Sequence, residues 1–175
     1  MTISKKILNY LNKNKVAHEI LKHKTVYTAF DLANTLAEKL NKVAKTLVVK
    51  VDKDYRLVVL PANVRLDTNK LKKILKAKVA EIVPEKTMEK VFKIKNGTIT
   101  PFGALHEVEV MIDKGLARAK DIIVRAGSLT EALRLQVKDL HKLEKATLGD
   151  FSETIKKAAA KAVKKAKQVS KKKRT

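Results

Sequence analysis

The chain has 175 residues, 45% of them hydrophobic, which suits one domain of about 150 residues and an additional segment. It has no cysteine, which excludes disulfides, thiol catalysis and cysteine-ligated zinc, and no apolar run approaches the roughly 20 residues of a membrane span. The net charge of +22 indicates an anionic partner, with nucleic acid the first candidate and an anionic membrane surface the second. The N-terminus lacks the long apolar stretch of a signal peptide, so we expect a cytoplasmic protein.

Apolar spacing predicts an alternation of helices and strands along the chain. Helices are expected at residues 4–14, 28–40, 67–75, 85–91 and 137–145, and strands at 16–21, 46–51, 56–60, 79–83, 108–112, 122–126 and 132–137. A hairpin turn at Asp52-Lys53-Asp54 separates two of the strands. Since strands follow one another both through hairpins and through helical crossovers, the pattern predicts an α+β fold with a mixed β-sheet and surrounding helices.

Basic residues concentrate at the C-terminal end. A break at residues 149–151 divides the chain into a domain at 1–150 and a lysine-rich tail at 151–175, whose composition favours a helix. The tail is either a phosphate-binding extension or a solvated, partly disordered appendage. Its basic residues are Lys156, Lys157, Lys161, Lys164, Lys165, Lys167, Lys171, Lys172, Lys173 and Arg174. The tail has no Trp, Phe or Leu beyond Phe151, which argues against membrane binding.

The most informative stretch is residues 96–103, which read NGTITPFG and hold two of the five glycines and one of the three prolines. Gly and Pro adopt backbone angles that other residues avoid, so this loop offers a ligand close approach to its backbone. A surface turn between two strands is the alternative interpretation.

Lys45 lies where a helical region gives way to an apolar strand, in the sequence AKTLVV. At such a position the stem packs against the core and the ammonium points into a cleft; the alternative is a surface lysine. The histidines show no metal-ligand spacing, and no nucleophile elbow, Walker loop or dinucleotide fingerprint is present. His106, just after the loop, is the one histidine that we keep as a functional candidate.

Several motifs occur in a fixed order: HKTVYTA at residues 23–29, AKTL at 44–47, GTITPFG at 97–103, Asp113, and AGS at 126–128. In order and spacing they resemble the YbaK family of aminoacyl-tRNA deacylases, which includes the editing insertion domain of bacterial prolyl-tRNA synthetases. The resemblance extends over about residues 4–145.

The resemblance implies a mixed α+β sheet around a cleft, and hydrolysis of the ester that joins a wrong amino acid, typically cysteine or alanine, to proline tRNA. Lys45 would be the catalytic residue, orienting the terminal adenosine and the ester. The other substrate-binding residues would be Tyr27, Thr28, Thr46, Gly97, Thr98, Ile99, Thr100, Pro101, Gly103 and Gly127. The family needs no metal or nucleotide cofactor, which agrees with the lack of a triad or metal cluster in the sequence.

One departure concerns specificity. Family members that edit alanine often carry a histidine near position 124, where this chain reads IIVRAG, so we expect a deacylase of the cysteine type or of broader specificity for small amino acids. The predicted function is that of a free-standing editing hydrolase whose tail binds tRNA. Prolyl-tRNA synthetase is a further candidate partner. The alternative is a non-catalytic nucleic-acid-binding protein on the same fold.

Overall fold

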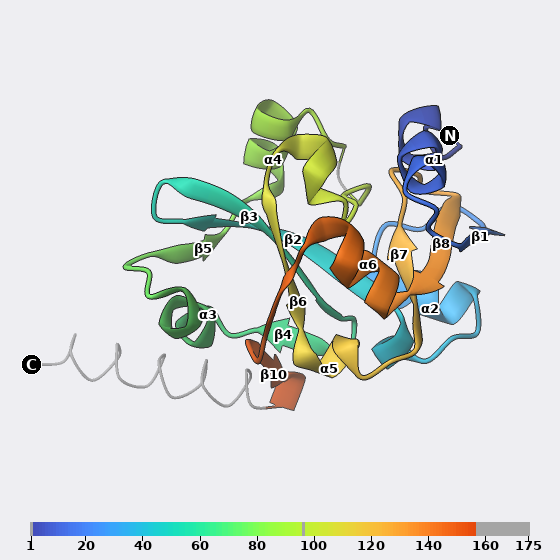
Figure 1. The fold of residues 1–175 in the computed structure, drawn as a ribbon. Helices are drawn as coiled ribbons and strands as arrows, with labels where there is room; N and C mark the ends of the chain where they lie inside the picture. The colour runs from blue at the N-terminus through green and yellow to red at the C-terminus, as the bar shows by residue number, and fades with distance from the viewer. Residues whose placement is uncertain (1, 96, 157–175) are drawn as a thin grey trace, which may run out of the picture.

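The computed structural model describes residues 2–95 and 97–156 (Figure 1). The helices in this part are α1 (Lys5–Lys13), α2 (Ala29–Thr35), η1 (Leu40–Lys42), α3 (Thr68–Leu75), α4 (Glu85–Phe92), η2 (Gly103–His106), α5 (Lys114–Ala117) and α6 (Val137–Glu144), of which η1 and η2 are 3-10 helices. The strands are β1 (His18–Lys22), β2 (Ala44–Val51), β3 (Asp54–Pro61), β4 (Val64–Leu66), β5 (Ala80–Ile82), β6 (Glu109–Asp113), β7 (Asp121–Arg125), β8 (Glu131–Gln136), β9 (Thr147–Gly149) and β10 (Ser152–Thr154).

The described strands form a mixed sheet and two smaller ones. The five-stranded sheet has the order β5-β2-β3-β6-β9, in which β2 pairs antiparallel with β3 and β5, whereas β6 pairs parallel with β3 and β9. Antiparallel pairs make the sheets β1-β8-β7 and β4-β10. A single parallel bridge between Val43 and Ile123 joins the start of β2 to β7. The α+β fold with a mixed sheet, predicted from the sequence, is confirmed.

The β2–β3 hairpin is buried on both faces, which explains its nearly continuous apolar sequence. Val48 and Leu57 belong to the main core, which also contains residues of α1, β7 and α6. Their neighbours Val49 and Val58 point the other way, into a smaller core beneath α3. With both faces buried, a shift of one residue would move every side chain of the strand to the wrong face, so the register is strongly specified.

The second helix is shorter than predicted. It ends at Thr35, and Ala37 adopts a left-handed φ of 52°. The Glu38 N–H donates to the Ala33 carbonyl at 2.9 Å and the Ala37 N–H to the Asn34 carbonyl at 3.3 Å, the two bonds of a Schellman cap. The expected helix to residue 40 is therefore wrong, because an alanine takes the position where glycine usually signals the helix end.

The packed body continues past residue 150. Phe151 is fully buried, its N–H donates to Asp113 Oδ2 at 3.2 Å, and its carbonyl accepts from the Asp67 N–H at 2.8 Å. The next three residues form β10 and pair with β4. Residues 149–151 are thus part of the fold and not a break. Lys156 is exposed, and the predicted tail residues from Lys157 onward lie outside the described residues.

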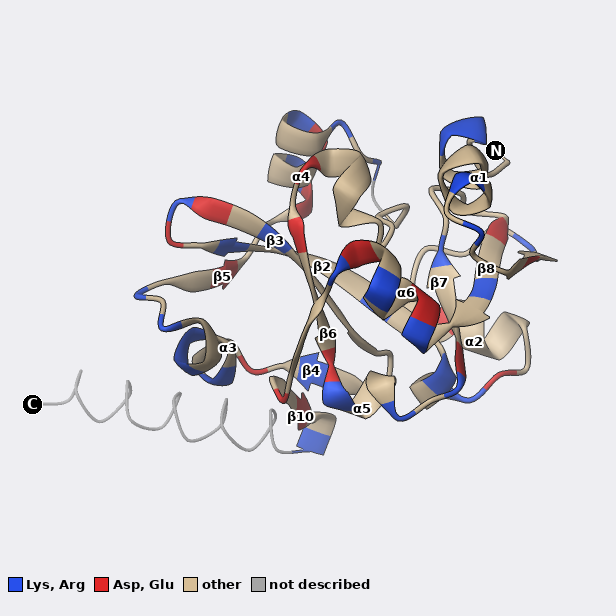
Figure 2. Ribbon diagram, viewed as in Figure 1, with Lys and Arg blue, Asp and Glu red and all other residues tan. Residues whose placement is uncertain are grey.

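Basic residues also occur on the body itself. Neither α1 nor α3 contains an acidic residue, and Figure 2 shows both helices carrying Lys or Arg. Positive charge is therefore not confined to the C-terminal segment. No helix among the described residues is long and apolar enough to cross a membrane.

The burial of Phe151 generates a stability prediction. Phe151→Ala should lower the free energy of unfolding by about 3–5 kcal/mol, because it empties a closed apolar site. Phe30→Ala is the matched control, since that ring is 55% exposed and its loss should cost less than about 0.5 kcal/mol. Denaturant titration followed by circular dichroism measures both. Equal, small losses would show that Phe151 belongs to an appendage.

Candidate active site

Lys45 follows the buried Ala44 at the start of β2. Its stem is half-buried, and Nζ donates a hydrogen bond to the Val64 carbonyl at the start of β4. Burial lowers the pKa of Lys45 below its ordinary value, and the positive charge of Arg65 lowers it further. The ammonium is thus held at the edge of the core with little solvent around it, where its charge acts strongly on a neighbouring group.

A cavity of about 170 Å³ lies beside Lys45. It brings together five of the residues that the sequence selects, namely Tyr27, Lys45, Thr46, Gly97 and Ile99. The remaining wall consists of Ala29, Ala44, Leu47, Glu85, Met88 and Arg125. The lining is therefore mainly apolar, with charged groups at Lys45, Glu85 and Arg125.

Gly97 allows the loop to pack closely against the segment that contains Tyr27. Its φ of +72° lies in the left-handed region, and a Cβ added there would lie 2.9 Å from the Tyr27 carbonyl oxygen. The next residue, Thr98, fastens the loop, since its N–H and its hydroxyl both donate to the Lys95 carbonyl, at 3.1 and 2.7 Å. The glycine is thus required by the contact between two segments of chain.

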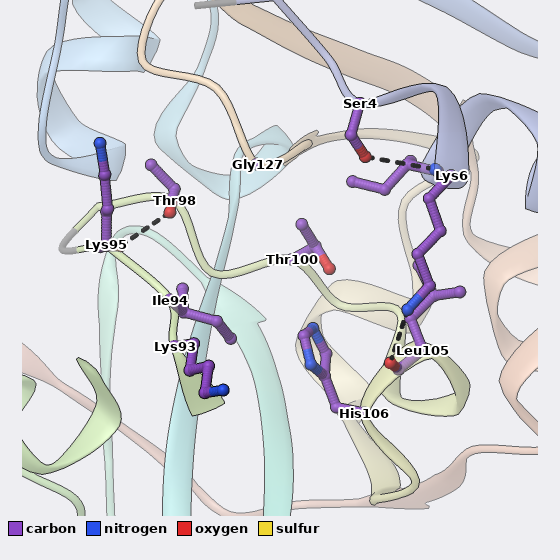
Figure 3. Close-up of a pocket in the computed structure, with 11 residues that line it drawn as sticks. Ser4, Lys6, Lys93, Ile94, Lys95, Thr98, Thr100, Leu105, His106 and Gly127 are labelled. Carbon is purple, nitrogen blue, oxygen red and sulfur yellow. Dashed lines mark hydrogen bonds between the residues drawn. The ribbon is translucent and has the colours of Figure 1, made fainter. Parts of the chain in front are cut away.

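Three other selected residues line a second cavity, which has a volume of about 310 Å³. Thr98, Thr100 and Gly127 line it, together with His106 (Figure 3). The two cavities have no lining residue in common. The structure therefore divides the predicted substrate-binding residues between two neighbouring sites.

Three selected residues line neither cavity. Thr28 caps α2: its Oγ1 accepts from the Asp31 N–H at 3.0 Å and donates to Asp31 Oδ2 at 2.6 Å. Pro101 is buried, and a Cβ on Gly103 would lie 2.3 Å from the Val108 carbonyl oxygen. Thr28, Pro101 and Gly103 thus support the local backbone.

Arg125 is a site residue that the motifs did not select. It is 5% exposed, and its guanidinium donates to the Val26 carbonyl at 2.9 Å and the Thr28 carbonyl at 3.0 Å. Burial lowers its pKa, partly offset by Asp31. These bonds hold the backbone on either side of Tyr27 against β7. An arginine inside the otherwise apolar run at 122–126 is the sequence signal that points to it.

Among the described residues, no group of three or more His, Asp or Glu side chains is arranged to hold a metal ion. The chemistry available at the Lys45 cavity is that of a half-buried ammonium, a buried guanidinium, a carboxylate and backbone groups. Such a set can position an ester and stabilise negative charge on its oxygen.

Comparisons with known proteins place this site in a family. Residues 23–143 match the model of the aminoacyl-tRNA editing domain. The prolyl-tRNA editing protein ProX of Acetoanaerobium sticklandii is 25% identical over 157 residues, which cover 86% of this chain and 96% of ProX. A proline–tRNA ligase of Thermosipho melanesiensis is 26% identical over 114 residues, 65% of this chain and 20% of the ligase.

The fold has a close structural counterpart. The crystal structure of hypothetical protein APE2540 superposes with a TM-score of 0.79 at 18% identity, covering 85% of this chain and 100% of that one. The family match includes Lys45, the loop at 97–103 and Arg125. It confirms the resemblance that the motifs indicate, and with it the expectation of an aminoacyl-tRNA editing enzyme. The chain belongs to the aminoacyl-tRNA editing domain family.

Proposed function

We propose that this protein acts in trans to hydrolyse the ester between tRNA, specifically proline tRNA, and a wrongly attached small amino acid such as cysteine. The observation that carries the proposal is the cavity in which Lys45 meets Gly97 and Ile99 of the glycine–proline loop. The match to ProX supports action as a separate protein, because it extends over 96% of that editing protein.

The proposed reaction needs no side-chain nucleophile. Water attacks the ester carbonyl carbon, and negative charge develops on the carbonyl oxygen as the carbon becomes tetrahedral. The intermediate then collapses: the bond from this carbon to the ribose oxygen breaks, and the ribose oxygen leaves with a proton from the attacking water. Lys45 is the proposed catalytic residue, because an ammonium held in a poorly solvated position stabilises such an oxyanion more than a solvated one would. The loop at 97–100 positions the aminoacyl group, which lowers the entropic cost of attack.

The size and lining of the cavity support a small substrate side chain. Leu47, Met88 and Ile99 give it an apolar wall, and its volume is about 170 Å³. Glu85 supplies a carboxylate on the same wall, suited to pair with the α-ammonium of the amino acid. Arg125 occupies the region where alanine-editing relatives often carry histidine, which supports cysteine over alanine.

Recognition of tRNA is assigned to basic surfaces. The C-terminal lysines follow directly after β10, and Lys156 is exposed at the point where they begin. We propose that they bind tRNA phosphates, aided by basic helices of the body (Figure 2). Prolyl-tRNA synthetase is a candidate partner, because a segment of a proline–tRNA ligase is itself 26% identical to this chain.

The alternative is a non-catalytic nucleic-acid-binding protein on the same fold. The assembled Lys45 cavity and the family membership favour the enzyme. The deciding experiment incubates the purified protein with tRNAs charged with cysteine, alanine, serine or threonine. We expect cysteinyl-tRNA to be deacylated fastest; tRNA binding without hydrolysis of any of the four would support the alternative.

Lys45→Ala should lower the rate of deacylation by roughly 10²–10³ while leaving the fold intact, because it removes the oriented charge next to the developing oxyanion. Lys50→Ala is the matched control, since Lys50 is an exposed lysine on the same strand. Single-turnover kinetics and circular dichroism measure the two effects. If the Lys45→Ala protein folds and has the same turnover as the control, Lys45 is not a catalytic residue.

Gly97→Ala should lower activity by about tenfold or more, since the added Cβ strains a left-handed backbone and meets the Tyr27 carbonyl oxygen. Gly97→Asn separates the two causes, because asparagine tolerates the left-handed region but also brings a Cβ. Kinetics of both variants, with thermal unfolding as a check of folding, measure the effect. Normal hydrolysis by both would mean that the loop is only a surface turn.

Deleting residues 157–175 removes nine basic residues and no acidic one, and keeps β10 intact. If these residues contact tRNA phosphates, affinity should fall by a similar factor for different tRNAs, and its salt dependence should flatten. Turnover at saturating tRNA should change little, while KM rises. Binding of both proteins over a salt series is the measurement. Equal affinities and slopes would reassign tRNA binding to the body.

A further inference from the structure

The second cavity has no role in the function proposed above. Its volume is about 310 Å³, against about 170 Å³ for the Lys45 cavity, and it lies between the start of α1, the segment after α4, and η2 (Figure 3). This volume is in the range of small-ligand sites.

The two cavities share the loop at residues 97–100 as a border. Along the loop, Gly97 and Ile99 line the Lys45 cavity, whereas Thr98 and Thr100 line the second one. Successive residues of an extended chain point to opposite sides, so the loop at 97–100 serves both cavities. A second stretch also borders both, with Arg125 in the first cavity and Gly127 in the second. The cavities are therefore adjacent, with the loop backbone between them.

The second cavity is lined by positive charge. Lys6, Lys93 and Lys95 surround it, all three are exposed, and no carboxylate occurs among the described residues that line it. The first turn of α1 adds to this charge, because it holds Lys5 and Lys6 and no acidic residue at the positive end of the helix dipole. The Glu131 carboxylate accepts from the Ile3 N–H at 2.8 Å but does not line the cavity. This arrangement favours an anion.

The interior of the second cavity is mainly apolar and includes the flat ring of His106. Ile7, Ile94 and Leu105 contribute aliphatic surface. His106 stands edge-on to Phe92, with ring centroids 6.2 Å apart and an interplanar angle of 88°, so its orientation is held. Burial and the nearby Lys6 lower the pKa of His106, which keeps its ring uncharged at neutral pH. An aromatic face with aliphatic neighbours suits a nucleobase, and cations at the rim suit its phosphate.

We propose that this second cavity binds the nucleotide that precedes the terminal adenosine of tRNA, with its base against His106 and its phosphate at Lys93 and Lys95. This inference rests on the proposed function, which places the terminal adenosine ester at Lys45. Consecutive nucleotides of a strand are covalently joined, so the nucleotide that precedes an adenosine at Lys45 must occupy a neighbouring site, and the second cavity borders the same loop. The enzyme then reads the amino acid and the adjoining nucleotide on opposite sides of one loop.

The test compares two esters of the same amino acid: cysteinyl-adenosine and cysteinyl-cytidylyl-adenosine. The Lys93→Ala/Lys95→Ala double variant is measured against Lys50→Ala/Lys53→Ala, which removes the same charge from exposed positions on the β2–β3 hairpin. We expect the wild-type protein and the control to hydrolyse the dinucleotide ester with a kcat/KM about tenfold above that for the adenosine ester. The Lys93/Lys95 variant should lose this advantage while its kcat/KM for the adenosine ester stays unchanged.

Two results would overturn the inference: an equal loss on both esters, or the same dinucleotide advantage in the variant and the control. If the wild-type protein hydrolyses neither ester, the proposed function fails, and calorimetric titration with uncharged cytidylyl-adenosine still decides on the cavity. Weaker binding in the Lys93/Lys95 variant than in the control supports it; equal binding overturns it. Binding of free cytidine monophosphate as tight as that of the dinucleotide would assign the cavity to a free nucleotide instead.

Discussion

Burial of β2 on both faces is the constraint on which the site depends. Because Val48 packs into one core and Val49 into another, the strand cannot shift by a residue without burying the wrong side chains. Its first residues, Ala44 and Lys45, are thereby fixed in place. Lys45 leaves the core where β2 meets the turn before β4, and its ammonium reaches the Val64 carbonyl. The position of the proposed catalytic charge thus follows from the packing of aliphatic residues several positions further along the strand.

The cationic side chains of Lys45 and Arg125 both line this small cavity, and burying each of them costs free energy. Burial lowers the pKa of both Lys45 and Arg125, which means that the folded protein disfavours their charged forms relative to water. The fold offsets the cost by giving Lys45 one carbonyl and Arg125 two. These carbonyls are dipoles without net charge; the carboxylate of Glu85 also lines the cavity, and Asp31 favours the charged form of Arg125. In the proposed reaction, these two cations lie next to the ester whose hydrolysis generates negative charge.

Sequence patterns predicted the long elements well and the short ones poorly. The strands at 46–51 and 56–60 carry a continuous apolar signal, whereas β4, β9 and β10 have three residues each and are held by tertiary pairing that no local pattern records. The end of α2 was missed because Ala37 takes the left-handed position. At the site, the order of short motifs led to Lys45 and Gly97, although their contacts, with Val64 and Tyr27, are distant in sequence. The contact of Arg125 with the carbonyls of residues 26 and 28 joins segments about a hundred positions apart, and only the folded chain reveals it.

The two stretches of chain that border both cavities each contain a glycine, at 97 and at 127. Each has a positive φ, +72° and +74°, and each lies in a stretch of the wall that both cavities share. A Cβ at 97 would press on the Tyr27 backbone, while one at 127 would lie 3.4 Å from Ile7 Cδ1, within ordinary contact. Gly97 therefore sets how closely the loop approaches the segment that Arg125 holds, and Gly127 allows the other stretch to turn after β7. In the proposed complex, these two stretches lie between the adenosine ester and the nucleotide that precedes it.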